Sequence, residues 1–143
     1  MQFDSNNKIV QLCGQGMNLE GAGKPDEARR MFQQAWQEAS NDFEKFIAAH
    51  YVARHQPSVT DKLTWDEASL RAALKVDDEN MKDVFPSLYL NIGKCYEDLN
   101  DFDQARKNYQ LAQSFADYLP NDGYGKMIRS GIISGLERVP VTG

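Results

Sequence analysis

The two histidines are the residues of this sequence that most invite a chemical interpretation, because imidazole serves both as a general base and as a metal ligand. His50 and His55 are five positions apart in a segment with helical periodicity. Ligands on one helix face stand four apart, as in the HExxH motif, which does not surround them. We therefore predict that His50 packs inside the protein, that His55 is exposed, and that neither binds a metal.

Two further segments have only a partial likeness to ligand-binding loops. Glu97 to Asp103, EDLNDFD, is acidic like a calcium loop but lacks its central glycine, and Tyr109 stands where the closing glutamate is required. Asn121 to Gly125, NDGYG, is the nearest approach to a glycine-rich loop and is interpreted as a helix connection. The acidic segment is interpreted as a turn capped by Asp101. No P-loop or nucleophile elbow occurs, so we predict no catalytic residue, no cofactor and no enzyme.

The composition and net charge of the chain limit the classes of partner that it is expected to bind. The chain has 143 residues, a formal net charge of −5 and 26% charged residues. An acidic chain without a basic cluster is not expected to bind nucleic acid or an anionic membrane. No apolar stretch approaches the roughly 18 residues of a spanning helix, and the N-terminus lacks a signal-peptide pattern. Cys13 and Cys95 lack the spacing of metal ligands and are predicted to be buried, reduced thiols of a cytoplasmic protein.

Helical periodicity runs through the sequence, and strand-like alternation is nearly absent. Caps and helix breakers divide the chain into seven predicted helices. For the fourth, Ser58 and Thr64 are alternative caps, and the earlier start is preferred because Val59, Leu63 and Leu70 then share a face. The predicted helices begin after a cap at Asp4 or Ser5, at Pro25, at Phe43, at Val59, near Pro86, at Phe102 and at Tyr124, and end near Gly21, Ala39, His55, Val76, Leu99, Leu119 and Val139.

One pattern occurs twice in the sequence. GMNLEGAGKPDEARRMFQQA begins at Gly16, and GKCYEDLNDFDQARKNYQLA begins at Gly93, 77 residues later. Seven positions are identical, and Phe32 of the first copy corresponds to Tyr109 of the second. The pattern predicts an antiparallel helix pair in which the glycine faces small residues of the second helix, while large side chains fill the space between pairs.

The two copies resemble the tetratricopeptide repeat family, whose helix-turn-helix unit has about 34 residues. Gly93, Ala105, Tyr109 and Ala112 occupy the main signature positions of that unit. The resemblance implies an all-α superhelix, a right-handed solenoid of three hairpins closed by a capping helix with a polar outer side. The predicted boundaries, within a single domain 1–143, are 5–40, 42–77, 84–119 and 124–139 for the cap. The second repeat is degenerate, with about nine inserted residues expected around 55–63.

The resemblance also implies a function. The first helices of such hairpins line a concave groove, so we predict a non-catalytic adaptor that binds a protein or peptide partner there. The alternatives are a structural module that forms a homodimer, and an enzyme or ligand-binding protein that uses the central insertion. The predicted groove residues are Val10, Cys13, Met17, Glu20, Tyr51, Arg54, Ser87, Leu90, Lys94 and Asp98.

Overall fold

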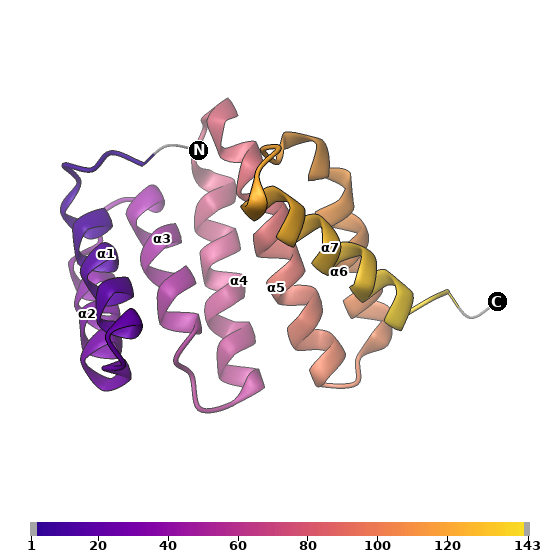
Figure 1. Cartoon of the computed structure of the whole chain (residues 1–143), viewed down its shortest axis with the longest axis horizontal. Helices are drawn as coiled ribbons and strands as arrows, with labels where there is room; N and C mark the ends of the chain where they lie inside the picture. The colour runs from indigo at the N-terminus through magenta and orange to yellow at the C-terminus, as the bar shows by residue number, and fades with distance from the viewer. Residues whose placement is uncertain (1–2, 142–143) are drawn as a thin grey trace. The chain divides into compact units, whose positions relative to one another are not determined.

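Figure 1 shows the computed structural model, which describes residues 3–141. Within these residues every regular element is a helix, and the chain forms two compact units, 3–76 and 77–141. The first unit consists of α1 (Lys8–Gly21), α2 (Pro25–Glu38), α3 (Asp42–Ala53) and α4 (Val59–Lys75). The second consists of the 3-10 helix η1 (Glu79–Asp83), α5 (Phe85–Asp98), α6 (Phe102–Ser114), the 3-10 helix η2 (Ala116–Tyr118) and α7 (Gly123–Arg138).

Side-chain caps set the starts of five of the seven α-helices described, whereas α2 and α5 have none. The carbonyl oxygen of the Asn7 side chain accepts hydrogen bonds from the backbone N–H groups of Ile9 and Val10, at 2.8 and 3.1 Å. The first helix therefore starts at Lys8, which is later than the start predicted from a cap at Asp4 or Ser5. Asn41 caps α3 by accepting from the backbone N–H of Glu44 at 2.9 Å, so this helix begins at Asp42, one residue before the predicted start. Such caps satisfy backbone donors that have no partner inside the helix.

The spacing of the caps fixes the register of the second hairpin. The cap residues Asn7, Lys24, Asn41 and Ser58 recur every 17 residues, and Val84 and Asp101 are also 17 apart. The interval from Ser58 to Val84 is nine residues longer. The inserted residues therefore follow the repeat-like part of α4 and include η1, and the predicted position around 55–63 is wrong.

The wrong position has a physical cause in the sequence of α4. WDEAS, which begins at Trp65, looks like PDEAR at the start of α2. In α2 this sequence forms the first turn, whereas α4 has already begun at Val59 under the Ser58 cap. The earlier of the two predicted caps is confirmed, because the Ser58 hydroxyl accepts from the backbone N–H of Asp61 at 3.1 Å.

In both clear copies of the repeat, a glycine of the first helix lies against an aromatic ring of the second. A Cβ atom added at Gly16 would lie 2.3 Å from the ring of Phe32, and one at Gly93 would lie 2.7 Å from the ring of Tyr109. Phe32 and Tyr109 have no exposed surface. The glycine is thus required mainly by the aromatic ring, which comes four residues after Ala28 or Ala105. The alanines themselves require it only secondarily.

The last helix packs on both helices of the third hairpin. Figure 1 shows α7 crossing α5 and α6, which both contact it. Ile128 and Ile132 of α7 enter a core cluster with Ala112 and Leu119. The outer side of α7 is less polar than a cap requires, because Met127 and Ile133 leave 61% and 54% of their surface exposed.

The inserted residues pack within the second unit. Met81 of η1 is buried, and the ammonium of Lys82 lies 5.3 Å from the ring centre of Tyr118 in η2. Phe85, which follows the insertion, packs against Phe115 with 5.2 Å between ring centres. The inserted residues are therefore packed against the rest of the second unit and do not form a free loop.

Candidate interaction surfaces

Three predicted groove residues come together on α1 and α3. The Glu20 carboxylate forms an ion pair with the guanidinium of Arg54, at 3.1 Å. The same guanidinium lies 5.5 Å from the ring centre of Tyr51. Tyr51 in turn stacks on Phe32, with 5.1 Å between the ring centres. These contacts hold the aromatic ring of Tyr51 and the guanidinium of Arg54, at the end of α3, in defined positions beside Glu20 of α1.

His55 belongs to this cluster, although the sequence suggested only an exposed side chain. Its Nε2 lies 2.6 Å from the second carboxylate oxygen of Glu20. Its ring also stacks on Phe32, with 5.6 Å between ring centres. The available signal was its position, since it directly follows Arg54 at the end of α3. Glu20 therefore receives two contacts from the end of the next hairpin's first helix.

The remaining predicted residues of α1 differ in accessibility. Met17 leaves 45% of its surface exposed and offers a flexible apolar contact. Val10 is half-buried. Cys13 is only 2% exposed, and burial raises the pKa of its thiol to about 12. Cys13 is therefore a core residue that cannot line the surface, which corrects its place in the predicted set.

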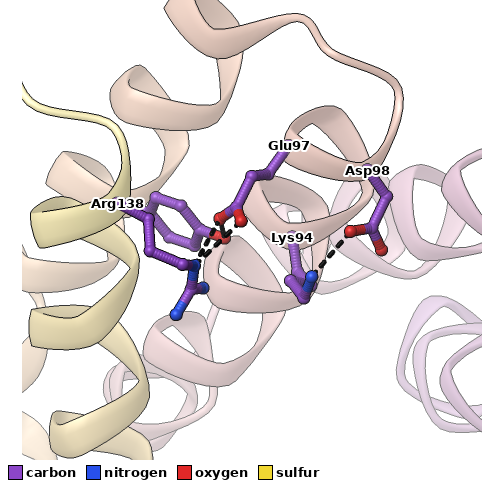
Figure 2. Close-up of polar contacts among 5 residues, drawn as sticks. Lys94, Glu97, Asp98 and Arg138 are labelled. Atoms are coloured by element: carbon purple, nitrogen blue, oxygen red, sulfur yellow. Dashed lines mark hydrogen bonds and ion pairs between the residues drawn. The ribbon is translucent and has the colours of Figure 1, made fainter.

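The second unit carries the other predicted residues on α5. Figure 2 shows Lys94 and Asp98 one helical turn apart, joined by an ion pair of 2.6 Å. Ser87 is half-buried, and its hydroxyl donates to the carbonyl oxygen of Val84 at 3.1 Å. Leu90 is half-buried and packs close to Gly131 of α7, because a Cβ atom added at Gly131 would lie 3.0 Å from the Leu90 side chain. Only Lys94 and Asp98 thus present charged groups at an exposed surface of this helix.

Next to this pair, α5 is joined to the end of α7. The Nε atom of Arg138 donates to both carboxylate oxygens of Glu97, at 3.1 and 2.8 Å (Figure 2). The hydroxyl of Tyr109 donates to the same carboxylate at 2.8 Å. Burial alone would raise the pKa of Glu97, but the hydrogen bonds from Arg138 and Tyr109 outweigh it and lower that pKa. The carboxylate therefore stays ionised and ties α6 and α7 to α5.

The ion pairs of Glu20 with Arg54 and of Glu97 with Arg138 are equivalent in the two copies of the repeat. Glu97 stands at the position of Glu20 in the second copy of the repeat. In each unit this glutamate binds an arginine at the end of the helix that stacks on its hairpin, either Arg54, the C-cap of α3, or Arg138 of α7. The α7 helix thus relates to α5 and α6 as α3 relates to α1 and α2. It takes the place of the first helix of a further repeat.

One aromatic position differs between the two arrangements. Three residues before its arginine, α3 carries Tyr51, which stacks on Phe32. The corresponding residue of α7 is Gly135, and a Cβ atom there would lie 2.7 Å from the ring of Tyr109. The Tyr109 ring is thus enclosed by glycines of both α5 and α7. The first unit presents an aromatic side chain at the position where the second has none.

The comparisons with known proteins agree with this architecture. Residues 86–117, which cover most of α5 and α6, match the model of the tetratricopeptide repeat family. The resemblance predicted from the sequence is confirmed for the third hairpin, which matches a tetratricopeptide repeat. No curated protein matches the chain.

A solved structure extends the likeness beyond that hairpin. The crystal structure of PcrH from Pseudomonas aeruginosa matches with a TM-score of 0.63, at 19% sequence identity, over 96% of each chain. The predicted all-α fold of packed helical hairpins is therefore confirmed.

Among residues 3–141, no group of three or more histidine, cysteine or acidic side chains is placed to hold a metal ion. In the same residues no helix is long and apolar enough to span a bilayer. What the first helices present is a thioether, an aromatic ring and ion-paired charges, which suit contacts with another polypeptide.

Proposed function

We propose that this protein is a non-catalytic interaction module that binds a peptide or a partner helix on the first helices of its hairpins. The observation that carries the proposal is the cluster on α1 and α3. An exposed Met17 lies on the same helix as Glu20, whose ion pair holds Arg54 over the ring of Tyr51. Pre-positioned aromatic and arginine side chains lose little entropy when a partner binds.

The proposal extends to α5 in the second unit. Lys94 and Asp98 leave about half of their side-chain surface accessible, at 52% and 42%. Their mutual ion pair is weak in water, so a partner can exchange it for contacts of its own. Lys94 and Met17 occupy the same position in the two clear repeat copies, directly after the aligned glycines Gly93 and Gly16. The surface of α1 therefore favours an apolar side chain of a ligand, and that of α5 an acidic one.

The experiment is selection of short peptides on the whole chain from a displayed random library, followed by calorimetry with purified variants. Met17→Glu is compared with Gln37→Glu, which adds the same charge on the exposed side of α2. Lys94→Glu is compared with Lys107→Glu on α6. We expect the first member of each pair to weaken binding at least about tenfold and the second to change it by less than about twofold. Equal losses in each pair, or failure to select any peptide, would refute the proposal.

A further inference from the structure

We propose that the turn between α5 and α6, together with the end of α7, forms a second binding site, which takes a peptide segment with a basic side chain beside an apolar one. The structure has an open cavity of about 540 Å³ here. Its walls are Asn100 to Asp103, Arg106, Arg138, Val139 and Pro140. None of these residues is among the predicted groove residues, so this site is additional to the surface of the proposed function.

The first repeat copy shows what this turn needs in order to fold. In both copies the chain turns through a residue with positive φ, Gly23 at 76° and Asn100 at 63°. The next two residues are Lys24 and Pro25 in the first copy, and Asp101 and Phe102 in the second. Proline is well suited to the first helical position, so no large apolar residue is required there.

Phe102 is therefore apolar surface that the turn itself does not require. It leaves 49% of its surface exposed at the wall of the cavity. Leu99, in the same turn, is 41% exposed, where the first copy has Ala22. Large apolar side chains gathered beside a cavity are typical of a contact surface.

The charges around the cavity favour a cationic ligand. The guanidinium of Arg106 donates to the carbonyl oxygens of Val139 at 3.1 Å and Pro140 at 3.4 Å. The guanidinium of Arg138 is held by Glu97. The Asp103 side chain is 92% exposed, and its ion pair with Arg106 is long, at 3.4 Å.

Ion pairing leaves one carboxylate of the cavity unmatched. The lining holds two carboxylates, Asp101 and Asp103, and two guanidinium groups, and Glu97, outside the lining, neutralises the guanidinium of Arg138. Asp101 uses its side chain to cap α6, accepting from the backbone N–H of Gln104 at 3.2 Å, and keeps further lone pairs for a ligand. A lysine or arginine of the ligand would bind between Asp101 and Asp103, with the neighbouring apolar residue on Phe102.

The part of the cavity wall that follows α7 is held in place before a ligand binds. Val139 is buried, in a cluster with Ala105 and Tyr109, and Arg106 fixes the two carbonyl groups that follow α7. Binding therefore does not have to order this segment, which lowers its entropic cost.

The test is an NMR titration of the labelled whole chain with an acetylated, amidated peptide of alternating leucine and lysine, and with the same peptide carrying glutamate for lysine. Phe102→Pro copies the first repeat, and the backbone permits it, because Asp101 (φ −95°, ψ 78°) resembles Lys24 (φ −117°, ψ 66°). Asp103→Asn is paired with Asp26→Asn, the corresponding carboxylate of the first turn. Both asparagine variants change the net charge equally.

We expect the lysine peptide to shift the amide signals of Asn100 to Arg106 and of Val139. We expect Phe102→Pro and Asp103→Asn each to weaken binding about tenfold, and Asp26→Asn to change it by less than about twofold. Equal effects of Asp103→Asn and Asp26→Asn would reduce the binding to general attraction by an acidic protein and overturn the proposal. Shifts caused by the glutamate peptide instead, or no shift in the turn, would also overturn it.

Discussion

Gly16 of α1 lies directly against the buried ring of Phe32 of α2, with no room for a methyl group between them. Alanine normally stabilises a helix relative to glycine by about 1 kcal/mol. At Gly16 the ring would have to move within a packed core, so Gly16→Ala should lower the free energy of unfolding by about 1–3 kcal/mol. Urea denaturation measures the difference.

Gly14 is the matched control for this prediction. It lies in the same helix, and a Cβ atom there meets nothing within 4 Å. Gly14→Ala should leave the stability unchanged or raise it by up to about 1 kcal/mol. If both alanine variants are equally stable, the close contact with Phe32 does not determine the choice of glycine.

The contact also shows which part of the fold could be predicted from sequence. The spacing of glycine, alanine and aromatic residue in the two copies was enough to predict the hairpin, because close helix packing permits few residues at those positions. It did not show that the ring, and not the alanines, covers the glycine. That distinction depends on where a side chain lies between two helices, which residue type alone does not determine.

The central hairpin was harder to predict because it has lost these marker residues. In the register of the caps, His50 stands at the position of Gly16 and Asp66 at that of Phe32. Without the small and aromatic residues, WDEAS was a misleading guide to the position of the insertion. The contacts of Glu20 with Arg54 and His55 could not be predicted from the sequence either, because they join side chains about one repeat apart.

The central histidine makes stability depend on pH. Burial lowers the pKa of His50, and the nearby Arg54 and Lys62 add to this, while Asp66 opposes it. Its Nδ1 atom is buried without a hydrogen-bond partner. The folded state disfavours the charged imidazole. The free energy of unfolding is therefore unaffected by this group above the unfolded pKa of about 6.5, and it decreases as the pH falls below that value.

His50→Gln removes this titration. We expect the loss of unfolding free energy between neutral pH and about pH 5 to be smaller in the variant than in the wild type. Urea denaturation across this range measures both slopes. An unchanged slope would show that His50 is not the group responsible.

The insertion between α4 and α5 should contribute to stability through Met81. This side chain of η1 is 1% exposed. Met81→Ala should therefore lower the free energy of unfolding by about 2–5 kcal/mol, as truncation of a buried side chain does. Its neighbour Lys82, whose ion pair with Glu79 and contact with Tyr118 lie at the surface, provides the control. Comparable effects of Met81→Ala and Lys82→Ala would mean that the insertion is not packed as described.

The ion pair between Glu97 and Arg138 connects α5 to the end of α7. The pKa of Glu97 is lowered, so its ionised form is bound more tightly in the folded state than in the unfolded chain. Its contribution is complete above the unfolded value of about 4.3 and is lost as the pH falls through the lower folded pKa. The stability difference between wild type and Glu97→Gln should therefore be constant near neutral pH and shrink below about pH 4.

A double-mutant cycle with Arg138→Met separates this ion pair from the hydrogen bond of Tyr109. We expect a coupling of about 0.5–1 kcal/mol, because Arg138 remains 45% exposed and water screens the pair. The same cycle with Glu20→Gln and Arg54→Met tests the equivalent pair, in which Arg54 is equally exposed. A coupling near zero in both cycles would mean that the two arginines hold their helices by packing and not by charge.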